Sequence, residues 1–157
     1  MKLKEILVFG ATGNIGRNLI RKLTKNNYKV VAVTRNIHQK GLQLKTQANP
    51  GYLELVELKS LDSEKIKDLF NSCSICINLI GILYEKNKGQ FNKIHSLLPD
   101  ILSKIAKEKK IDQFIHVSAL GVENASDSTY AKSKLNGELN VRKNFKNALI
   151  LKPSIVY

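Results

Sequence analysis

The sequence has no hydrophobic run that approaches the roughly 20 consecutive apolar residues of a membrane-spanning helix. It also lacks a targeting signal. The start from Met1 to Phe9 is basic and then apolar, but the apolar part is too short for a signal peptide and leads directly into a glycine-rich turn. We interpret this start as a first β-strand and expect a cytoplasmic location. Internal repeats and low-complexity linkers are missing as well, so 157 residues with 43% apolar composition predict one domain with its own core.

Cysteine is scarce, and its arrangement excludes two familiar sites. The only two cysteines, Cys73 and Cys76, have the spacing C-x-x-C. A zinc site would need a second pair, or histidines at ligand spacing, and neither is nearby. A thioredoxin-like pair should open a helix, whereas this pair is expected to close a helix and enter a strand. We therefore expect buried, inert thiols and no metal site.

Acidic residues are few, with 13 Asp and Glu against 26 Lys and Arg, which gives a net charge of +13. Such an excess raises the hypothesis of a nucleic-acid or anionic-membrane partner. The lysines are spread along the chain, however, with one short cluster at 107–110, and no nucleic-acid-binding motif accompanies them. We favour solvated helix faces and expect no nucleic-acid partner, although a basic surface would suit an acidic ligand.

Short apolar runs alternate with segments of helical spacing along the whole sequence. The expected strands are 6–9, 30–33, 53–58, 75–80, 114–117 and 149–151. The expected helices begin near Ile15, at Ser63 with Asp62 as a cap, and over 91–109 with a bend at Pro99; another covers 129–143, and 37–51 predicts a short helix and a turn. This alternation predicts an α/β fold with a doubly wound parallel (Rossmann) sheet in the order 3-2-1-4-5-6, truncated after the sixth strand.

A glycine-rich turn with the spacing G-x-x-G-x-x-G follows the first strand and opens the first helix. Glycine permits the tight turn, the close approach of a pyrophosphate to the backbone, and close packing of helix on strand. The amides and the dipole at the helix N-terminus would hold the negative charge. The context of the turn, inside a βαβ unit, is the one that a dinucleotide requires. The expected contacts are Gly10, Thr12, Gly13, Asn14, Ile15 and Gly16.

The end of the second strand carries an arginine where NAD-binding proteins usually carry an acid for the ribose 2′-hydroxyl. Arg35 suits the 2′-phosphate of NADP through charge-assisted hydrogen bonds, and Arg17 could support it from the first helix. We therefore prefer NADP(H) to NAD(H). The alternative is that Arg35 is a solvated surface residue.

Three further residues have the chemistry of proton exchange with a substrate oxygen. Ser118 ends the fifth strand, and Tyr130 and Lys134 are four residues apart, on one face of a helix. A neighbouring ammonium should lower the pKa of the tyrosine phenol, which could then act as the acid/base while a nicotinamide carries hydride. Lys134 could also reach the nicotinamide ribose, and Ser118 could hydrogen-bond the substrate oxygen.

Together these motifs resemble the extended and atypical short-chain dehydrogenase/reductase family over essentially the whole chain. The stretches 78–85, 114–121 and 152–156 are similar, more narrowly, to the NADPH-binding accessory subunits of respiratory complex I and their bacterial relatives. In that group the cofactor is often regarded as structural. The resemblance implies that Asn78, Gly81 and Pro153 contact the cofactor, together with Tyr130 and Lys134.

The sequence departs from the family at two positions. Extended members usually place an acid after the third strand, where this chain has Lys59, and an asparagine of the proton relay in the fourth helix, where it has His95. The alternative for His95 is a helix residue packed at the edge of the site. We expect residues 1–157 to be one NAD(P)-binding domain, without the C-terminal substrate domain of extended members.

Two hypotheses of different class follow. The first is an oxidoreductase that uses Tyr130 as acid/base. The second is a non-catalytic NADPH-binding accessory or assembly subunit of a respiratory NADH:quinone oxidoreductase, peripheral at the inner membrane. A nucleotide-sugar epimerase or dehydratase fits Arg35 and the 78–81 stretch poorly. Expected protein partners are respiratory-complex subunits or a second copy of the chain.

Overall fold

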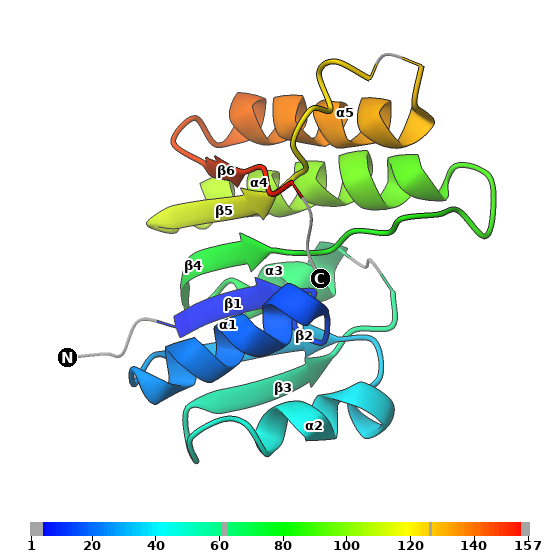
Figure 1. Ribbon diagram of the computed structural model, residues 1–157. Coiled ribbons are helices and arrows are strands. Elements are labelled where there is room, and N and C mark those ends of the chain that lie inside the picture. Colours follow the sequence, from blue (N-terminus) through cyan, green and yellow to red (C-terminus); the bar gives the residue numbers. More distant parts are fainter. Residues whose placement is uncertain (1–4, 61–62, 126, 155–157) are drawn as a thin grey trace.

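The protein, described here from a computed structural model over residues 5–60, 63–125 and 127–154, is built on one parallel sheet (Figure 1). The strand order is β3-β2-β1-β4-β5-β6, with every neighbouring pair parallel. This confirms the predicted Rossmann order. The strands are β1 (Glu5–Phe9), β2 (Lys29–Thr34), β3 (Leu53–Glu57), β4 (Cys73–Asn78), β5 (Gln113–Val117) and β6 (Leu149–Leu151).

Helices cover both faces of the sheet, as the alternating pattern predicts. They are α1 (Asn14–Lys25), the π-helix η1 (Ile37–Gly41), α2 (Leu42–Lys45), α3 (Ser63–Leu69), the π-helix η2 (Asn92–Leu97), α4 (Leu98–Glu108) and α5 (Thr129–Asn144). Figure 1 shows α1 and α2 in front of the sheet and α3 and α4 behind it. The expected cap of α3, Asp62, lies outside the described residues.

The alternation of side chains along the strands divides the core into two layers. Leu7 and Phe9 of β1 face the cluster that contains Leu98 and Leu102 of α4. Their neighbours Ile6 and Val8 face the other cluster, which contains Ile20 of α1 and Leu44 of α2. Because both faces of β1 are buried, its sequence is a continuous apolar run, which is typical of a central parallel strand.

The expected helix over 91–109 is present, but its first part is wound differently. Residues Asn92–Leu97 form the π-helix η2, and Pro99 lies in the first turn of the α-helical part that follows. Proline has no amide hydrogen to give to the preceding turn, so the start of an α-helix is where it is tolerated. The π-to-α junction was not predicted, and the bend expected at Pro99 stays a prediction.

The cysteines differ from the expectation in two respects: both belong to β4, so Cys73 does not close a helix, and Cys73 is not fully buried. Cys76 is fully buried, and Cys73 is partly exposed. Burial raises the pKa of Cys73 to about 11 and that of Cys76 well above its ordinary value. Three residues along a strand span about 10 Å, too far for a disulfide, whose Cα atoms lie within about 7 Å. The expectation of inert thiols is thus consistent with their positions.

The helices offer no candidate for a membrane span, since none within the described ranges is both long and apolar enough to cross a bilayer.

Candidate functional site

The glycine turn between β1 and α1 is too crowded for side chains at two of its three glycines. Gly10 has φ +80°, and a Cβ there would lie 2.9 Å from the carbonyl carbon of Leu79, which follows β4. A Cβ on Gly16 would lie 2.4 Å from the carbonyl oxygen of Gly10 and 2.5 Å from that of Ala11. Glycine is therefore required at the first position by backbone conformation and at the last by helix-to-strand packing.

The middle glycine, Gly13, is the N-cap residue of helix α1 and provides no side-chain cap. Its amide donates to the Gly10 carbonyl (3.1 Å), and its own carbonyl accepts from Arg17 (3.0 Å). The first turn of α1 contains no acidic residue. Thr12 and Ile15 are half-buried beside the turn, and Asn14 is exposed. A helix start without a side-chain cap and without negative charge is suited to receive an anion.

Of the two arginines expected near a 2′-phosphate, Arg35 directly follows β2 and Arg17 lies in the first part of α1. Arg17 and Arg35 are both exposed, and neither forms an ion pair with a carboxylate of the described chain. Sequence reasoning missed Glu57, which is paired in register with Thr34. Its carboxylate accepts from the Ile37 amide (3.1 Å) and lies 3.4 Å from Lys59 Nζ.

The amide of Ile37, followed by the Lys59 ammonium, lowers the pKa of the Glu57 carboxyl. Glu57, the last residue of β3, is therefore an acid two positions before Lys59, where the family resemblance expects one. Its charge is already compensated by Lys59.

A buried polar pair joins the ends of β4 and β5. Asn78 Nδ2 lies 3.2 Å from His116 Nδ1, and Asn78 Oδ1 accepts from the Ile80 amide (3.2 Å). Because the Asn78 amide nitrogen can only donate, we assign the proton of His116 to Nε2. That nitrogen is buried and has no partner in the described chain. Burial, followed by the Lys134 charge, lowers the pKa of His116 to about 3.

Asn78, expected as a cofactor contact, thus uses both ends of its side chain within the protein.

His95, on η2, connects three segments of the site. Its Nε2 accepts from the Ile82 amide (3.0 Å), and its Nδ1 lies 2.9 Å from the Ser133 hydroxyl of α5. A backbone amide can only donate, so Nδ1 carries the proton and donates to Ser133, which in turn donates to the Tyr130 carbonyl (2.7 Å). His95 is 1% exposed. Burial, followed by the Lys134 charge, lowers its pKa to about 4. Both nitrogens of this neutral ring are occupied, so it does not have the free acceptor that a proton relay would use.

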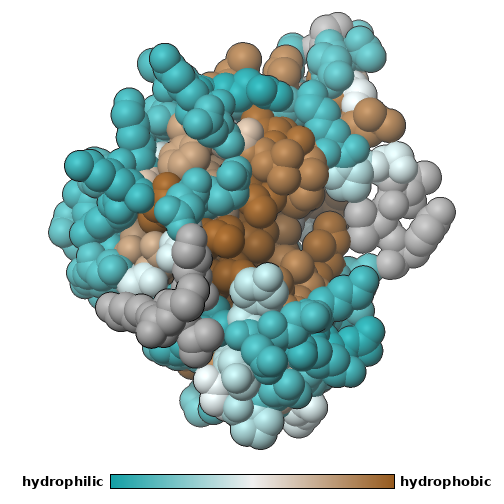
Figure 2. Space-filling view, turned by 90° about the vertical axis from the view of Figure 1, so that its left-hand side faces the viewer, coloured by the Kyte–Doolittle hydropathy of each residue, from teal (hydrophilic) through white to brown (hydrophobic). Residues whose placement is uncertain are grey.

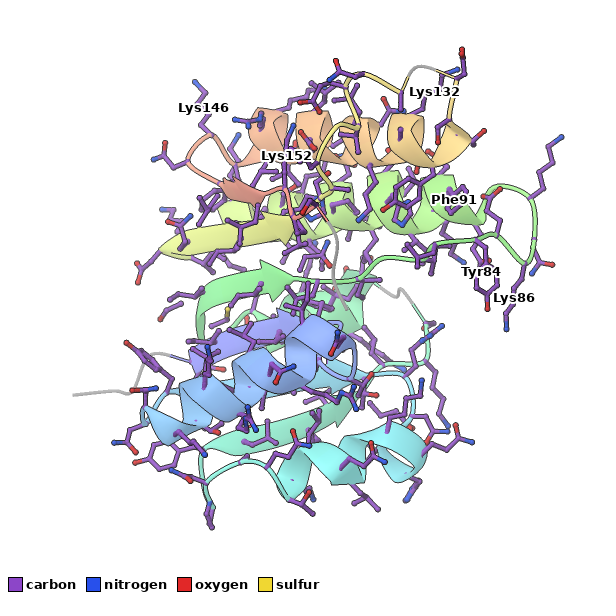
Figure 3. All side chains as sticks on the ribbon, in the orientation of Figure 1. Tyr84, Lys86, Phe91, Lys132, Lys146 and Lys152 are labelled. Carbon is purple, nitrogen blue, oxygen red and sulfur yellow. The ribbon has the colours of Figure 1, made fainter. Side chains whose placement is uncertain are left out.

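Tyr130 and Lys134 lie on α5 beside this histidine, as the four-residue spacing predicts. The Tyr130 ring packs edge-on against His95 and Phe91, with centroids 5.2 and 5.6 Å apart. Lys134 Nζ lies 3.4 Å from the Val117 carbonyl, and a methyl group on Gly81 would lie 3.2 Å from it. Phe91 projects at the carboxyl-end edge of the sheet, on the same side as Tyr84 (Figure 3).

The electrostatics of these two residues differ from the expectation. Burial lowers the pKa of Lys134 to about 8, so the ammonium is held at a cost. Burial also raises the pKa of Tyr130, which is the reverse of the predicted lowering by Lys134. The phenol therefore stays protonated at neutral pH. The prediction treated Lys134 as a freely exposed charge and overlooked that burial weakens its own charged form.

Ser118 and Pro153 complete this edge of the site. The Ser118 hydroxyl is buried without a partner in the described chain, while its amide donates to the Leu151 carbonyl (2.8 Å). The Pro153 carbonyl accepts from the Leu120 amide (3.0 Å), which joins the segments that follow β5 and β6. Ser118 thus has an unused polar group at the position where a substrate oxygen was expected.

Sequence reasoning missed Gly137, which sets the distance between α5 and η2. A Cβ at this position would lie 1.9 Å from the carbonyl oxygen of His95 and 3.3 Å from Pro99 Cγ. A lone glycine inside a helix usually has such a packing reason, so this signal was present in the sequence. Ser133, the partner of His95, had no comparable signal.

The residues present fit a nicotinamide dinucleotide. A glycine cradle leads into a helix without a side-chain cap, the exposed Arg35 directly follows β2, and Ser118 and His116 have buried polar atoms without partners in the described chain. These features lie at the carboxyl ends of the strands around β1 and β4, where a doubly wound sheet binds its ligand.

Comparison with known proteins agrees with this geometry. The family model for NAD(P)H-binding proteins matches residues 10–152. The chain is 31% identical over 150 residues to NADH dehydrogenase [ubiquinone] 1 alpha subcomplex subunit 9, mitochondrial, from Mus musculus, covering 96% of this chain and 40% of the relative. It is 27% identical over 154 residues to a ceramide reductase of Caulobacter vibrioides, covering 97% and 46%.

Among solved structures, UDP-glucuronic acid 4-epimerase from Bacillus cereus in complex with NAD superposes with a TM-score of 0.79 at 25% identity, over 98% of this chain and 57% of that one. The chain spans less than half the length of the curated relatives it matches. The match over 10–152, the strand order and the glycine cradle lead to one conclusion: the chain belongs to the NAD(P)H-binding family, with a fold of the short-chain dehydrogenase/reductase type.

Proposed function

We propose that this protein binds NADP(H) in preference to NAD(H) and holds it as a bound cofactor without turnover. The observation that carries the binding is the glycine cradle, in which Gly10 and Gly16 leave no room for a Cβ and Gly13 begins α1 without a side-chain cap. The amides of this helix start would hold the pyrophosphate. The contacts proposed for the rest of the cofactor are those of the sequence prediction: Thr12, Asn14, Ile15, Arg35, Asn78, Gly81, Tyr130, Lys134 and Pro153.

The preference for NADP(H) rests on Arg35. Its guanidinium is exposed at the end of β2 and has no carboxylate partner in the described chain, while the nearby Glu57 is neutralised by Lys59. A 2′-phosphate would give this guanidinium a charge-assisted hydrogen bond of about 1.5–3 kcal/mol, which is roughly a 10- to 100-fold difference in affinity.

Titration with NADPH and NADH tests this preference. Arg35→Ala should weaken NADPH binding by at least about tenfold and leave NADH binding within about twofold. Arg21→Ala, which removes an exposed arginine of α1 that is not among the proposed contacts, is the matched control and should change neither affinity. Equal affinities for the two cofactors that are insensitive to Arg35→Ala would reject the preference.

The absence of turnover rests on His95 and Tyr130. Both nitrogens of His95 are engaged, by Ile82 and by Ser133, and burial raises the pKa of Tyr130. The protons of the His95 ring and the Tyr130 phenol are therefore not readily given up by this site. A relative that is a subunit of NADH dehydrogenase supports an accessory role in a respiratory complex, peripheral at the membrane. Co-purification with respiratory subunits, and nucleotide that stays bound through gel filtration, are the expected results.

A second candidate function, an oxidoreductase, is favoured by the buried Ser118 hydroxyl, which has no partner in the described chain and follows the Val117 that Lys134 contacts, and by the ceramide reductase relative. A bound nicotinamide would supply the hydride chemistry. Tyr130 would give or take the proton at its phenol oxygen, and Ser118 would orient the substrate oxygen through its hydroxyl. Tyr130→Phe separates the two functions, because it should abolish any carbonyl reduction, whereas NADPH binding should lose at most the one contact that the Tyr130 hydroxyl makes with the cofactor. Turnover that survives this change would exclude the catalytic role.

The homodimer expected from the family stays a prediction. Leu97 of η2 and Leu139 of α5 are the exposed apolar side chains on those helices that such a dimer would bury, at 48% and 57% exposure.

A further inference from the structure

At the end of the sheet opposite the glycine cradle, the ends of α4 and α5 border an open hollow of about 270 Å³. It is lined by Lys107, Lys110, Lys143, Asn144, Phe145, Lys146 and Asn147. Figure 3 shows Lys146 at the left-hand end of the molecule, whereas Tyr84 and Lys86 lie at the right-hand end, to which the strands point. Figure 2 looks onto the left-hand end and shows hydrophilic side chains, including those in its upper part, around apolar surface in the middle.

No ion pair within the described ranges joins the four lysines of this hollow to a carboxylate, although the charge of Lys143 acts on the Asp100 carboxyl. None of the lining residues is acidic, and the ion pairs within the described ranges do not include these lysines. Two acids close to these lysines in sequence are paired elsewhere, since Glu108 pairs with Lys67 (3.7 Å) and Glu138 with Lys152 (2.9 Å). Four like charges around one depression repel one another, and an anion between them would relieve that repulsion.

The ordinary explanation for lysines at helix ends is compensation of the helix dipole, and here it is insufficient. Each helix C-terminus carries about half a negative charge, so two helix ends offset roughly one of the four ammonium charges. The carbonyls at these ends already accept from the backbone: Ile105 from Lys109, Ala106 from Ile111 and Val141 from Phe145. None of the four ammonium groups hydrogen-bonds to them within the described chain.

The base of the hollow is fixed by contacts with the rest of the fold, and its four lysines are exposed. The Phe145 ring packs against Phe114 of the core with centroids 6.1 Å apart. The Asn144 amide donates to Asp100 and Ser103, and the Asn147 carbonyl accepts from Gln113 (3.1 Å). A preformed base reduces the entropy that a ligand would lose on binding.

We propose that this hollow is a second ligand site, which binds a small compound with a di- or triphosphate group. Its volume lies just below the roughly 300–1,000 Å³ of typical small-molecule sites, too small for a second dinucleotide. Lysine binds phosphate as a point charge. A group of four lysines therefore suits an anion with several negative charges better than it suits a single carboxylate. The site is independent of the nucleotide proposed above.

Calorimetric titration with inorganic tripolyphosphate tests the site. Two variants are compared, each of which loses four of the 13 net positive charges. One carries Lys→Gln at 107, 110, 143 and 146. The other carries Lys→Gln at 25, 45, 65 and 93, which are exposed lysines on α1, α2, α3 and η2. Thermal melting confirms that both are folded.

The hollow variant should bind tripolyphosphate at least tenfold more weakly than the control variant, which should bind like the unaltered chain. Amide chemical shifts should move at Lys146 and Asn147 and not at Gly13. Equal losses in the two variants, shifts confined to the glycine turn, or no binding by the unaltered chain would overturn the proposal. Flotation with vesicles of equal parts phosphatidylglycerol and phosphatidylcholine distinguishes a lipid surface: vesicle binding that needs the four lysines, without tripolyphosphate binding, would also overturn it.

Discussion

Acid should destabilise this protein well before its carboxylates titrate, because His95 and His116 are buried as neutral rings. Their pKa values are lowered to about 4 and about 3, whereas an unfolded histidine has a pKa near 6.5. The unfolded chain therefore binds more protons than the folded chain below pH 6.5, and stability falls as the pH falls through that value. At pH 5 both folded rings are still neutral, so each contributes a loss of about 2 kcal/mol relative to pH 7.5, or about 4 kcal/mol together.

Urea unfolding followed by circular dichroism at pH 7.5, 6 and 5 measures this loss. A loss of about 4 kcal/mol is large against the 5–15 kcal/mol of a typical domain, so the midpoint should shift strongly. His95→Gln and His116→Gln should each remove about half of the pH dependence between 7.5 and 5, whatever they do to the stability at pH 7.5. Stability that is constant over this range, or a pH dependence that both variants retain in full, would refute the assignment of two neutral buried rings.

Three further predictions concern packing, the turn and the buried lysine. Gly137→Ala places a Cβ 1.9 Å from the His95 carbonyl oxygen, so an overpacking cost of about 3 kcal/mol should exceed the helix-propensity gain of about 1 kcal/mol. Urea unfolding should show a net loss of stability of about 2 kcal/mol, with Asn136→Ala at an exposed position of the same helix as the control. An unchanged unfolding midpoint would contradict the close contact. Gly16→Ala brings a methyl group to 2.4 Å from the Gly10 carbonyl oxygen and should lower NADPH affinity at least tenfold in a fluorescence titration. The control Arg21→Ala should leave that affinity unchanged. Retained affinity in Gly16→Ala would show that the turn does not hold the cofactor. Lys134→Met removes a buried charge and should raise the unfolding free energy at pH 7 by about 2 kcal/mol while weakening nucleotide binding. This gain in stability should shrink from pH 8 to 10.5, because Lys134 of the unaltered folded chain loses its proton over that range. A variant that is destabilised at pH 7 would be inconsistent with the lowered pKa of Lys134.

The architecture could be predicted from the sequence because its signals are local. The apolar run of β1, the glycine turn and the helical spacing of α1 are contiguous, and the order of the sheet follows from rules of connection. The boundaries were less accurate: β4 begins at Cys73, two residues before the expected start, because Cys73 pairs with Glu5 across a register shift. That pairing depends on a partner 68 positions away and leaves no local pattern.

The chemistry of the site was harder to predict because it depends on burial. The spacing of Tyr130 and Lys134 predicted their shared helix face, but not that burial would dominate both of their pKa values. The role of His95 depends on the Ile82 amide and the Ser133 hydroxyl, one on a loop and the other on a different helix. A backbone partner such as the Ile82 amide has no residue type by which a sequence could reveal it.

The thiols of β4 give this chain a natural reporter of its own unfolding. Reaction with a disulfide reagent requires thiolate and access, and the folded chain restricts both, with Cys76 fully buried and the pKa of Cys73 raised to about 11. An unfolded cysteine, with a pKa near 8.5, would react far faster at the same pH. A short pulse of such a reagent should therefore modify open molecules selectively, and modification of Cys76 would record opening at the centre of the sheet without any introduced label.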